Sequence, residues 1–389
     1  MKNLLIIVIL INATNVLAQP CGNRYLKSIF SSVNKNTITF DIQPSYKNTA
    51  DTLFADIYTP IGDTETNRAG VIFVHGGGFV GGTRNGGNIP LLCENLAKRG
   101  YIVASIDYRL GVLDTTANQK GKAQIRAIQD LKSFIRFSKQ NAATLNLDVN
   151  KLFIAGSSAG GATCLATAFM SYSERPSYVD TSGVGSIDGR GNINGQSTKI
   201  KGVFSMWGGV SDTTWIQTGD IPVGCIQSIY DPCIPWTYIP SSCNVPGYPV
   251  FGSSSINQRA NNLGIYSRLY GFNTSVHDYG LDNLNGLDTT IVEMTTFFYN
   301  ILCGTTTGLN ENFGNNQSIV YPNPFSTEVN IAPTMKDFQY KLYDLHGRII
   351  KQGQNEYNIT TSDLPSGVYV LKVFNRSNNY SFKIMKEYN

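Results

Sequence analysis

The stretch LFIAGSSAGG, residues 152–161, decides the fold. Four apolar residues lead directly into a turn of glycine, serine and alanine, and a helix is predicted for residues 159–170. This is the G-x-S-x-G pattern between a strand and a helix, where small residues allow a sharp, strained turn. Such a turn lifts a serine above the carboxyl edge of a sheet. The register of the pattern selects Ser158 rather than Ser157 as the reactive hydroxyl.

A second glycine-rich motif, HGGGF at residues 75–79, ends another apolar run. Glycine lets backbone N–H groups come within about 3 Å of a carbonyl oxygen on which negative charge develops. We predict that the amides of Gly77, Gly78 and Ala159 form an oxyanion hole, although the order of the loop leaves open which glycines point inward. No Walker-type lysine follows, which disfavours a phosphate-binding loop.

Between residues 36 and 303, apolar runs alternate with segments of helical periodicity. Near-continuous apolar strands separated by helices predict an α/β fold with a mostly parallel sheet covered on both faces. The polar stretch 171–199 interrupts this rhythm and is either a surface insertion or a flap beside the site. Strands are predicted at 36–43, 53–58, 70–75, 101–106, 152–155, 200–207, 225–230 and 265–272, and helices at 122–143 and 159–170.

These motifs resemble those of the α/β-hydrolase carboxylesterase family, in its hormone-sensitive-lipase-like branch. The similarity covers about residues 36–303 and includes DIYTP at 56–60 and DYR at 107–109. It implies the α/β-hydrolase fold and a Ser…Asp/Glu…His triad in that chain order. We expect the DYR residues to form an internal ion-pair or hydrogen-bond network rather than to take part in the chemistry.

The base of the triad is found among only three histidines. His75 belongs to the glycine loop, and His346 lies near the C-terminus beyond a polar linker. His277 follows the last predicted strand, where the family carries its base, and is the predicted base of Ser158.

The acid that orients this histidine is predicted to be Asp231. It opens the turn DPCIP at 231–235, which resembles the acid loop of the family, and it precedes His277 in the chain. Its role would be to fix the ring tautomer and stabilise the imidazolium. Three other acids remain open: Asp212 and Asp220 in loops, and Asp278, which is adjacent to His277 and poorly placed to reach its Nδ1.

Aromatic residues near these motifs are candidates for substrate binding. We predict contacts from Phe79, at the end of the glycine loop, and from Trp236, with Trp207, Trp215 and Tyr238 as further candidates. The chemistry requires no metal and no organic cofactor, and no CxxC or His–Cys cluster suggests zinc.

The N-terminus has the features of a signal peptide. Lys2 precedes an apolar run over residues 4–11, and residues 16–18 resemble a cleavage site, so we predict a signal peptide over residues 1–18 and a catalytic domain over 19–303. The apolar run is too short to span a bilayer.

An exported chain with seven cysteines should contain disulfides and at least one unpaired thiol. We expect Cys93 and Cys164 to be buried thiols and one bridge to form among Cys225, Cys233 and Cys243.

A composition change at residues 304–317 predicts a linker, and alternating strands with turn signals predict a small β-sandwich over 318–389. Four motifs of this tail, in order, resemble the C-terminal sorting domain of the type IX secretion system: YPNPF at 321–325, LYD at 342–344, GR at 347–348 and LPSGVY at 364–369. The alternative is a carbohydrate-binding β-domain.

Together these features predict a secreted or cell-surface serine hydrolase of carboxylic esters, acting on short-chain, aryl or polysaccharide-linked esters and using the secretion machinery as partner. The alternatives are a serine peptidase on the same fold and a non-catalytic binding domain. A net charge of only +4 and no long basic run argue against nucleic acid as a partner.

Overall fold

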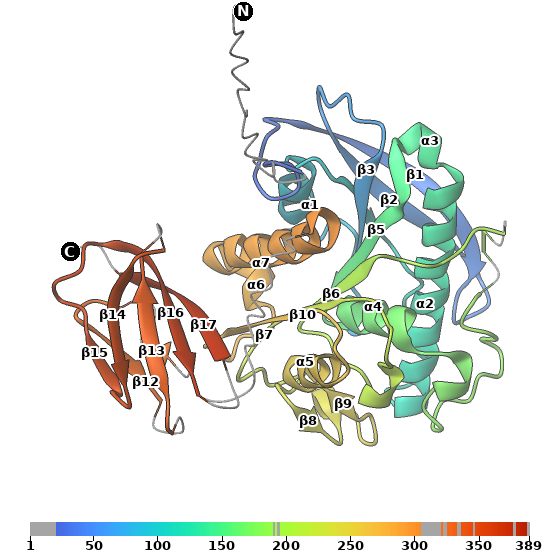
Figure 1. The fold of residues 1–389 in the computed structure, drawn as a ribbon. Coiled ribbons are helices and arrows are strands. Elements are labelled where there is room, and N and C mark those ends of the chain that lie inside the picture. Colours follow the sequence, from blue (N-terminus) through green and yellow to red (C-terminus); the bar gives the residue numbers. More distant parts are fainter. Residues whose placement is uncertain are drawn as a thin grey trace, which may run out of the picture. The chain divides into compact units, whose positions relative to one another are not determined.

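The computed structural model describes residues 21–189, 191, 192, 195–304, 320, 321, 325–332, 336–344, 347–375 and 379–386. The predicted signal peptide at 1–18, residues 305–317 of the predicted linker, and His346 lie outside these residues. The chain divides into two compact units, Met1–Gly304 and Thr305–Asn389, each of which is described by itself (Figure 1).

The first unit is built on an eight-stranded sheet with the order β1-β2-β4-β3-β5-β6-β7-β10. The strands β1 and β2 form an antiparallel hairpin, β2 is also antiparallel to β4, and all other neighbours are parallel. The sheet is therefore mostly parallel, as predicted. Its strands are β1 (Val33–Pro44), β2 (Ala50–Pro60), β3 (Arg68–Val74), β4 (Ile102–Ile106), β5 (Leu147–Ser157), β6 (Gly202–Met206), β7 (Val223–Ser228) and β10 (Ser267–Phe272).

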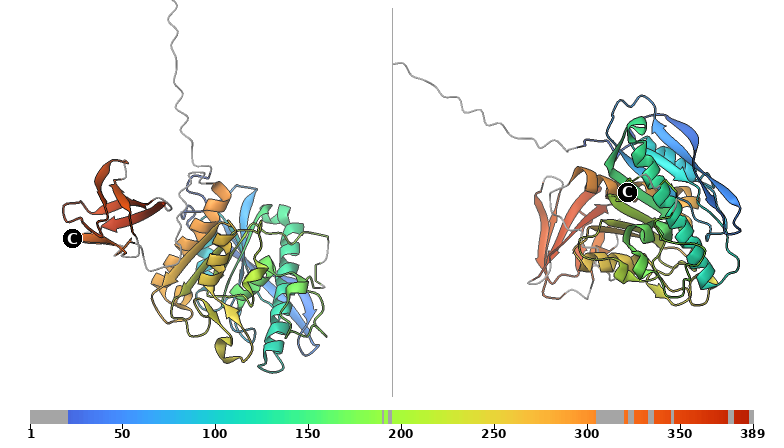
Figure 2. Two further views of the ribbon diagram at one scale, coloured as in Figure 1. Left: turned by 60° about the horizontal axis from the view of Figure 1, so that its bottom comes forward. Right: turned by 90° about the vertical axis from the view of Figure 1, so that its right-hand side faces the viewer.

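Helices cover both faces of this sheet (Figures 1 and 2). One face carries α1 (Ile89–Ala97), α6 (Tyr279–Asp282) and α7 (Leu284–Cys303); the other carries α2 (Ala117–Gln140), α4 (Ala159–Phe169) and α5 (Ser253–Asn262). The remaining elements are short: α3 (Ala142–Leu145), the 3-10 turns η1 (Tyr172–Glu174), η2 (Thr213–Trp215) and η3 (Ser242–Asn244), and the small hairpin of β8 (Tyr238–Ile239) and β9 (Val250–Phe251).

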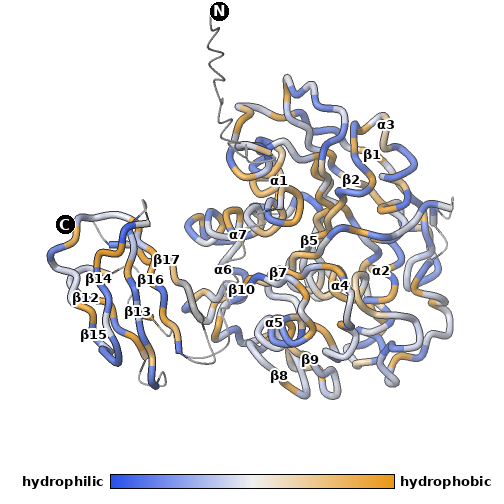
Figure 3. The backbone as a smooth tube through the Cα atoms, viewed as in Figure 1, coloured by the Kyte–Doolittle hydropathy of each residue, from blue (hydrophilic) through white to orange (hydrophobic). Residues whose placement is uncertain are grey.

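The central strands are apolar on both faces because each face packs against a layer of helices (Figure 3). In β3, Val71 and Phe73 join the cluster that includes α1 and α7, whereas Ile72 and Val74 join the cluster that includes α2 and α4. Side chains alternate between the faces of a strand, so the run of apolar residues fills two cores at once.

Two disulfides stabilise this unit. Cys21 is bonded to Cys303 at the end of α7, and Cys233 is bonded to Cys243. The expected bridge among the three clustered cysteines is thus confirmed, with Cys225 left over as a buried thiol. Cys93 and Cys164 are also buried thiols, as predicted.

The second unit consists of two small antiparallel sheets around a shared apolar core, which confirms the predicted β-sandwich. Phe325 of the YPNPF motif and Leu364 and Tyr369 of the LPSGVY motif lie in this core. One sheet has the order β11-β12-β15 and the other β14-β13-β16-β17. The strands are β11 (Val320–Tyr321), β12 (Glu328–Ile331), β13 (Gln339–Tyr343), β14 (Ile349–Gln354), β15 (Asn358–Thr360), β16 (Gly367–Phe374) and β17 (Asn379–Lys386).

Candidate active site

Ser158 stands at a sharp turn between β5 and α4. Its φ of 51° lies in the left-handed region, which a serine adopts only where the surrounding structure enforces it. The neighbouring glycines explain how the turn closes. A Cβ on Gly156 would lie 2.6 Å from the backbone of Gly160, and a Cβ on Gly160 would lie 2.1 Å from the Val74 carbonyl oxygen of β3. Only glycine therefore fits at both positions.

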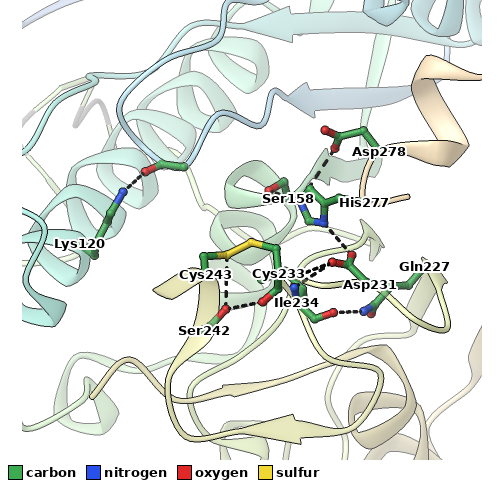
Figure 4. The surroundings of a disulfide bond; sticks show 11 residues. Lys120, Ser158, Gln227, Asp231, Cys233, Ile234, Ser242, Cys243, His277 and Asp278 are labelled. Carbon is green, nitrogen blue, oxygen red and sulfur yellow. Dashed lines mark hydrogen bonds and ion pairs between the residues drawn. A yellow bond between two sulfur atoms is a disulfide. The ribbon is translucent and has the colours of Figure 1, made fainter. Parts of the chain in front are cut away.

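The structure brings Ser158, His277 and Asp231 together in one chain of contacts (Figure 4). His277 lies in the loop between β10 and α6, with its Nε2 2.9 Å from Ser158 Oγ and its Nδ1 2.6 Å from Asp231 Oδ2. A carboxylate can only accept a hydrogen bond, so Nδ1 of His277 carries the ring proton. Nε2 is then unprotonated and can accept a hydrogen bond from the Ser158 hydroxyl. This is the geometry required of a nucleophile, a base and an orienting acid.

Asp231 is fixed on its other oxygen by the loop that follows β7. The backbone N–H groups of Cys233 and Ile234 donate to Asp231 Oδ1 at 2.8 and 3.0 Å. The side chain of Asp231 is fully buried, so its charge is held by the two amides and the imidazole rather than by water. The Cys233–Cys243 disulfide and a hydrogen bond from Ser242 Oγ to the Cys233 carbonyl close this loop beside the acid (Figure 4).

The surroundings of His277 favour its protonated form. Burial of the ring opposes protonation, but the hydrogen bond and the negative charge of Asp231, with a contribution from Asp278, outweigh burial and raise the pKa of His277. Asp278 Oδ1 lies 3.9 Å from Nε2, on the nitrogen that faces Ser158, and makes no contact with Nδ1. Of these two carboxylates, Asp231 is therefore the one that meets Nδ1 of His277.

The other candidate acids and histidines have different surroundings. Asp212 caps the turn η2, and Asp220 accepts the Gln217 N–H. His75 is buried, its ring stacks on Tyr108, and burial lowers its pKa. Neither Asp212 nor Asp220 contacts His277.

The glycine loop after β3 approaches Ser158 closely. Gly77 has a φ of 111°, and a Cβ there would lie 2.1 Å from the Gly81 carbonyl oxygen, so the loop can take this shape only with glycine at position 77. A Cβ on Gly76 would lie 3.1 Å from that of Ser158. Among the hydrogen bonds of the described residues, none uses the amide of Gly77 or Gly78 as donor. These two N–H groups therefore have no hydrogen-bond acceptor within the described part of the chain.

A hollow of about 100 Å³ opens beside Ser158. Phe79, one of the two predicted substrate contacts, lies on its wall. The other walls come from α2, α4 and the segment after Asp231; the lining residues beyond Ser158 and Phe79 are Gly78, Lys120, Gln124, Ala159, Ala162, Gly209, Ser211, Ile234, Ser242, Cys243, Val245, Tyr248 and Val250. No sequence motif marked Lys120, Tyr248 or Val250, since Lys120 of α2 lies far along the chain from Tyr248 and Val250 and meets them only in the fold.

Trp236, the other predicted substrate contact, does not line the hollow, and its contact with a substrate stays a prediction. Its backbone carbonyl accepts from Ser254 of α5, and its ring lies beside Gly271 of β10. Trp207 and Trp215 are fully buried core residues, although the ring of Trp207 lies 6.5 Å from that of His277.

The 171–199 segment is a surface insertion along α2. Asp180 and Asp188 form ion pairs with Lys122 and Lys132 of that helix. None of its described residues lines the hollow, so the flap alternative is not supported. The insertion supports the site only indirectly, since the ring of Tyr178 packs against that of Tyr248.

The DYR residues form an internal network, as expected. Asp107 accepts from the guanidinium of Arg84 at 2.7 Å, and Arg109 forms a buried ion pair with Asp130. The hydroxyl of Tyr108 donates to the His75 carbonyl at 3.2 Å. These contacts anchor the glycine loop and the middle of α2 without reaching Ser158.

Two family models match the chain. Residues 55–221 match the family described as BD-FAE, and residues 319–387 match the secretion system C-terminal sorting domain. The chain thus joins a domain that is similar to α/β-hydrolases of the esterase type to a C-terminal domain that matches the secretion sorting family. The sorting domain directs the protein to the cell surface or the extracellular space, which also decides against the carbohydrate-binding alternative for the tail.

Solved structures with this fold include esterase 2 of Thermogutta terrifontis phosphoramylated by tabun. The TM-score is 0.50 at 18% identity, over 69% of this chain and 94% of that one. The propionate-bound form of the same esterase gives a TM-score of 0.49 at 18% identity, over 68% and 93%. At this identity the likeness to the first of these structures supports the α/β-hydrolase fold alone.

A curated relative is the neuroligin-like protein glit-1 of Caenorhabditis elegans, 27% identical over 142 residues, or 36% of this chain. The match spans only 19% of the length of that relative. Within the described residues, no group of three or more His, Cys, Asp or Glu side chains is placed to hold a metal ion. None of the helices in the described part combines the length and hydropathy needed to cross a bilayer.

Proposed function

We propose that this protein is a secreted serine hydrolase of carboxylic esters, with Ser158 as nucleophile, His277 as base and Asp231 as orienting acid. The observation that carries the proposal is the position of His277, which contacts Ser158 Oγ through Nε2 and the buried Asp231 through Nδ1. The free amides of the glycine loop support it, because acyl transfer needs donors aimed at the developing oxyanion.

In the first half of the reaction, His277 Nε2 takes the proton of Ser158 Oγ as the oxygen attacks the ester carbonyl carbon. The carbonyl oxygen becomes an oxyanion and is stabilised by N–H groups of Gly77, Gly78 and Ala159. Asp231 stabilises the imidazolium and remains ionised. When the intermediate collapses, the bond to the alcohol oxygen breaks, and His277 donates its proton to the leaving alkoxide.

In the second half, a water molecule attacks the acyl-enzyme while His277 takes one of its protons. Collapse of the second intermediate breaks the bond to Ser158 Oγ, which recovers its proton from His277, and the carboxylic acid leaves. The chain's own residues supply every proton transfer, so the cycle closes without a cofactor.

The size of the hollow favours a short acyl group. At about 100 Å³ it is well below the roughly 300–1,000 Å³ of pockets for drug-sized ligands. The walls near Ser158 are largely apolar, through Phe79, Ile234, Val245 and Val250. We therefore place small acyl groups in the hollow, carried by simple alcohols, aryl groups or an extracellular polysaccharide that stays outside it.

The test is hydrolysis of p-nitrophenyl esters from acetate to decanoate by the wild type, Ser158→Ala and His277→Ala. We expect turnover that is greatest for the short chains and is abolished in both variants. Circular dichroism and the melting temperature control for folding. Equal rates in all three proteins, or no ester turnover by a folded wild type, would contradict the proposal. Turnover of peptide substrates alone would favour the peptidase alternative, and binding without turnover the non-catalytic one.

A further inference from the structure

One lining residue of the hollow stands out from the others by its charge. Lys120, on the first turns of α2, is the only charged side chain among the lining residues of the described chain. Its Nζ donates to the carbonyl oxygen of Gly78, in the glycine loop, at 2.7 Å (Figure 4). The cation is therefore anchored on the wall of the hollow, beside the glycine loop.

Lys120 has no carboxylate partner among the described residues, in contrast to its neighbours on the same helix. Lys122 and Lys132 form ion pairs with Asp180 and Asp188 of the 171–199 insertion. The one side-chain hydrogen bond of Lys120 goes to a neutral carbonyl, which leaves two of its three ammonium protons for another acceptor. Burial lowers the pKa of Lys120, which reflects the cost of holding this charge partly away from water.

The position on the helix adds to the positive potential. Lys120 is close to the N-terminus of α2, where the helix dipole already favours anions, and the first turn contains no acidic residue. Gln124, one turn further along, also lines the hollow, so two polar residues of α2 face the same space. An uncompensated cation with a neighbouring amide is a suitable receptor for a carboxylate.

We propose that Lys120 selects esters whose acyl group ends in a carboxylate, that is, half-esters of short dicarboxylic acids. This inference rests on the proposed function, because it assigns the far end of the acyl group bound beside Ser158. The apolar walls would contact the methylene groups, and Lys120 would bind the carboxylate. The small volume restricts the acid to about four carbons.

The experiment compares monoethyl succinate with ethyl 4-methylpentanoate, in which two methyl groups replace the two carboxylate oxygens. The quantity measured is the ratio of kcat/KM for the two esters, from ethanol release. We expect Lys120→Met to lower this ratio by about tenfold or more, the effect of losing one hydrogen bond to a charged group. Lys120→Arg should keep most of the preference, and added salt should reduce it in the wild type.

Lys122→Met is the matched control, since it removes the same charge from the same helix outside the hollow; its ratio should equal that of the wild type. If Lys120 only supported the Gly78 carbonyl, Lys120→Met would slow both esters equally, and an unchanged ratio would overturn the inference. A wild type that hydrolyses p-nitrophenyl butyrate through Ser158 but shows no preference for the half-ester would also overturn it, while the proposed function would stand. Hydrolysis of no ester at all would contradict the proposed function itself.

Discussion

Two loops complete the site around Ser158, and they are held in shape by different means. The glycine loop after β3, residues 75–82, depends on the absence of side chains, since a Cβ on Gly77 or Gly82 would lie 2.1 or 2.4 Å from a backbone oxygen. The acid loop after β7, residues 231–243, depends on specific partners: two amides on Asp231 Oδ1, the Ser242 hydroxyl and a disulfide. The first loop is therefore recognisable as a short motif, whereas the second depends on contacts between residues ten positions apart.

The largest expected effect is in the acid loop. Asp231→Asn should lower kcat by about 10⁴-fold, because an amide in this position no longer fixes the Nδ1–H tautomer or stabilises the imidazolium. Steady-state hydrolysis of p-nitrophenyl butyrate measures it. Asp278→Asn, which changes the neighbouring acid, should remain within a few-fold of the wild type above neutral pH. A larger loss of kcat in Asp278→Asn than in Asp231→Asn would show that Asp278, and not Asp231, orients His277.

In the glycine loop, Gly77→Ala should lower kcat by about 10²–10³-fold, the effect of removing one oxyanion donor. The added Cβ would collide with the Gly81 carbonyl, and the φ of 111° is strained for alanine, so the loop must move away from the oxyanion. Gly81→Ala is the matched control: a Cβ there meets nothing within 4 Å, and its activity should be retained. Equal losses in both variants would mean that the loop does not depend on the conformation of Gly77.

Removing the Cys233–Cys243 disulfide by double substitution with serine should have a smaller effect on turnover, about tenfold or less. The Cys233 and Ile234 amides still hold Asp231, but the wall of the hollow loses its cross-link. The free energy of unfolding should fall by about 3 kcal/mol, from the chain entropy of a loop of this size.

The matched variant lacks the Cys21–Cys303 disulfide, which closes a far longer loop away from Ser158. It should lose more stability, up to about 5 kcal/mol, while kcat at 25 °C is unchanged. Chemical denaturation and ester turnover separate the two bridges. If turnover fell in the variant without the Cys21–Cys303 disulfide but not in the variant without the Cys233–Cys243 disulfide, the second bridge would not be the one that supports the site.

The smallest expected effect is on pH dependence. Turnover requires neutral His277, so kcat/KM should fall as the pH decreases through the raised pKa of that residue. Asp278 contributes to raising this pKa. Asp278→Asn should therefore move the acidic limb of the kcat/KM profile to lower pH. A limb that stays in place, or that moves to higher pH, would show that the charge of Asp278 does not act on His277.

The contrast between the loops also explains what the sequence could predict. The sequence predicts the buried strands, the sharp turn at Ser158 and the glycine loop because each is a local pattern with a local physical cause. The choice of Asp231 needed the order of the chain and a family resemblance in addition. For Trp236 the sequence gives no indication of the direction in which its ring points, and in the structure this ring lies beside Gly271 rather than on the wall of the hollow.

Pairings between residues far apart in the chain cannot be predicted from the sequence, because no local pattern marks them. The Cys21–Cys303 bridge joins residues 282 positions apart, and nothing in the spacing of seven cysteines selects it. Lys120 resembles any other helix lysine until the fold places it against Gly78. Residues that complete a site from distant elements become visible only through their neighbours in space.

The most direct test of the central claim is to identify the residue that attacks an activated ester analogue. The wild type is treated with diethyl p-nitrophenyl phosphate, which transfers its phosphoryl group to a nucleophilic serine, and the adduct is located by peptide mass spectrometry. We predict one diethylphosphoryl group on Ser158 with parallel loss of ester turnover, retention of labelling in Ser157→Ala, and none in Ser158→Ala. Ester turnover that persists without labelling of Ser158, or an adduct at another residue that accounts for inactivation, would contradict the account.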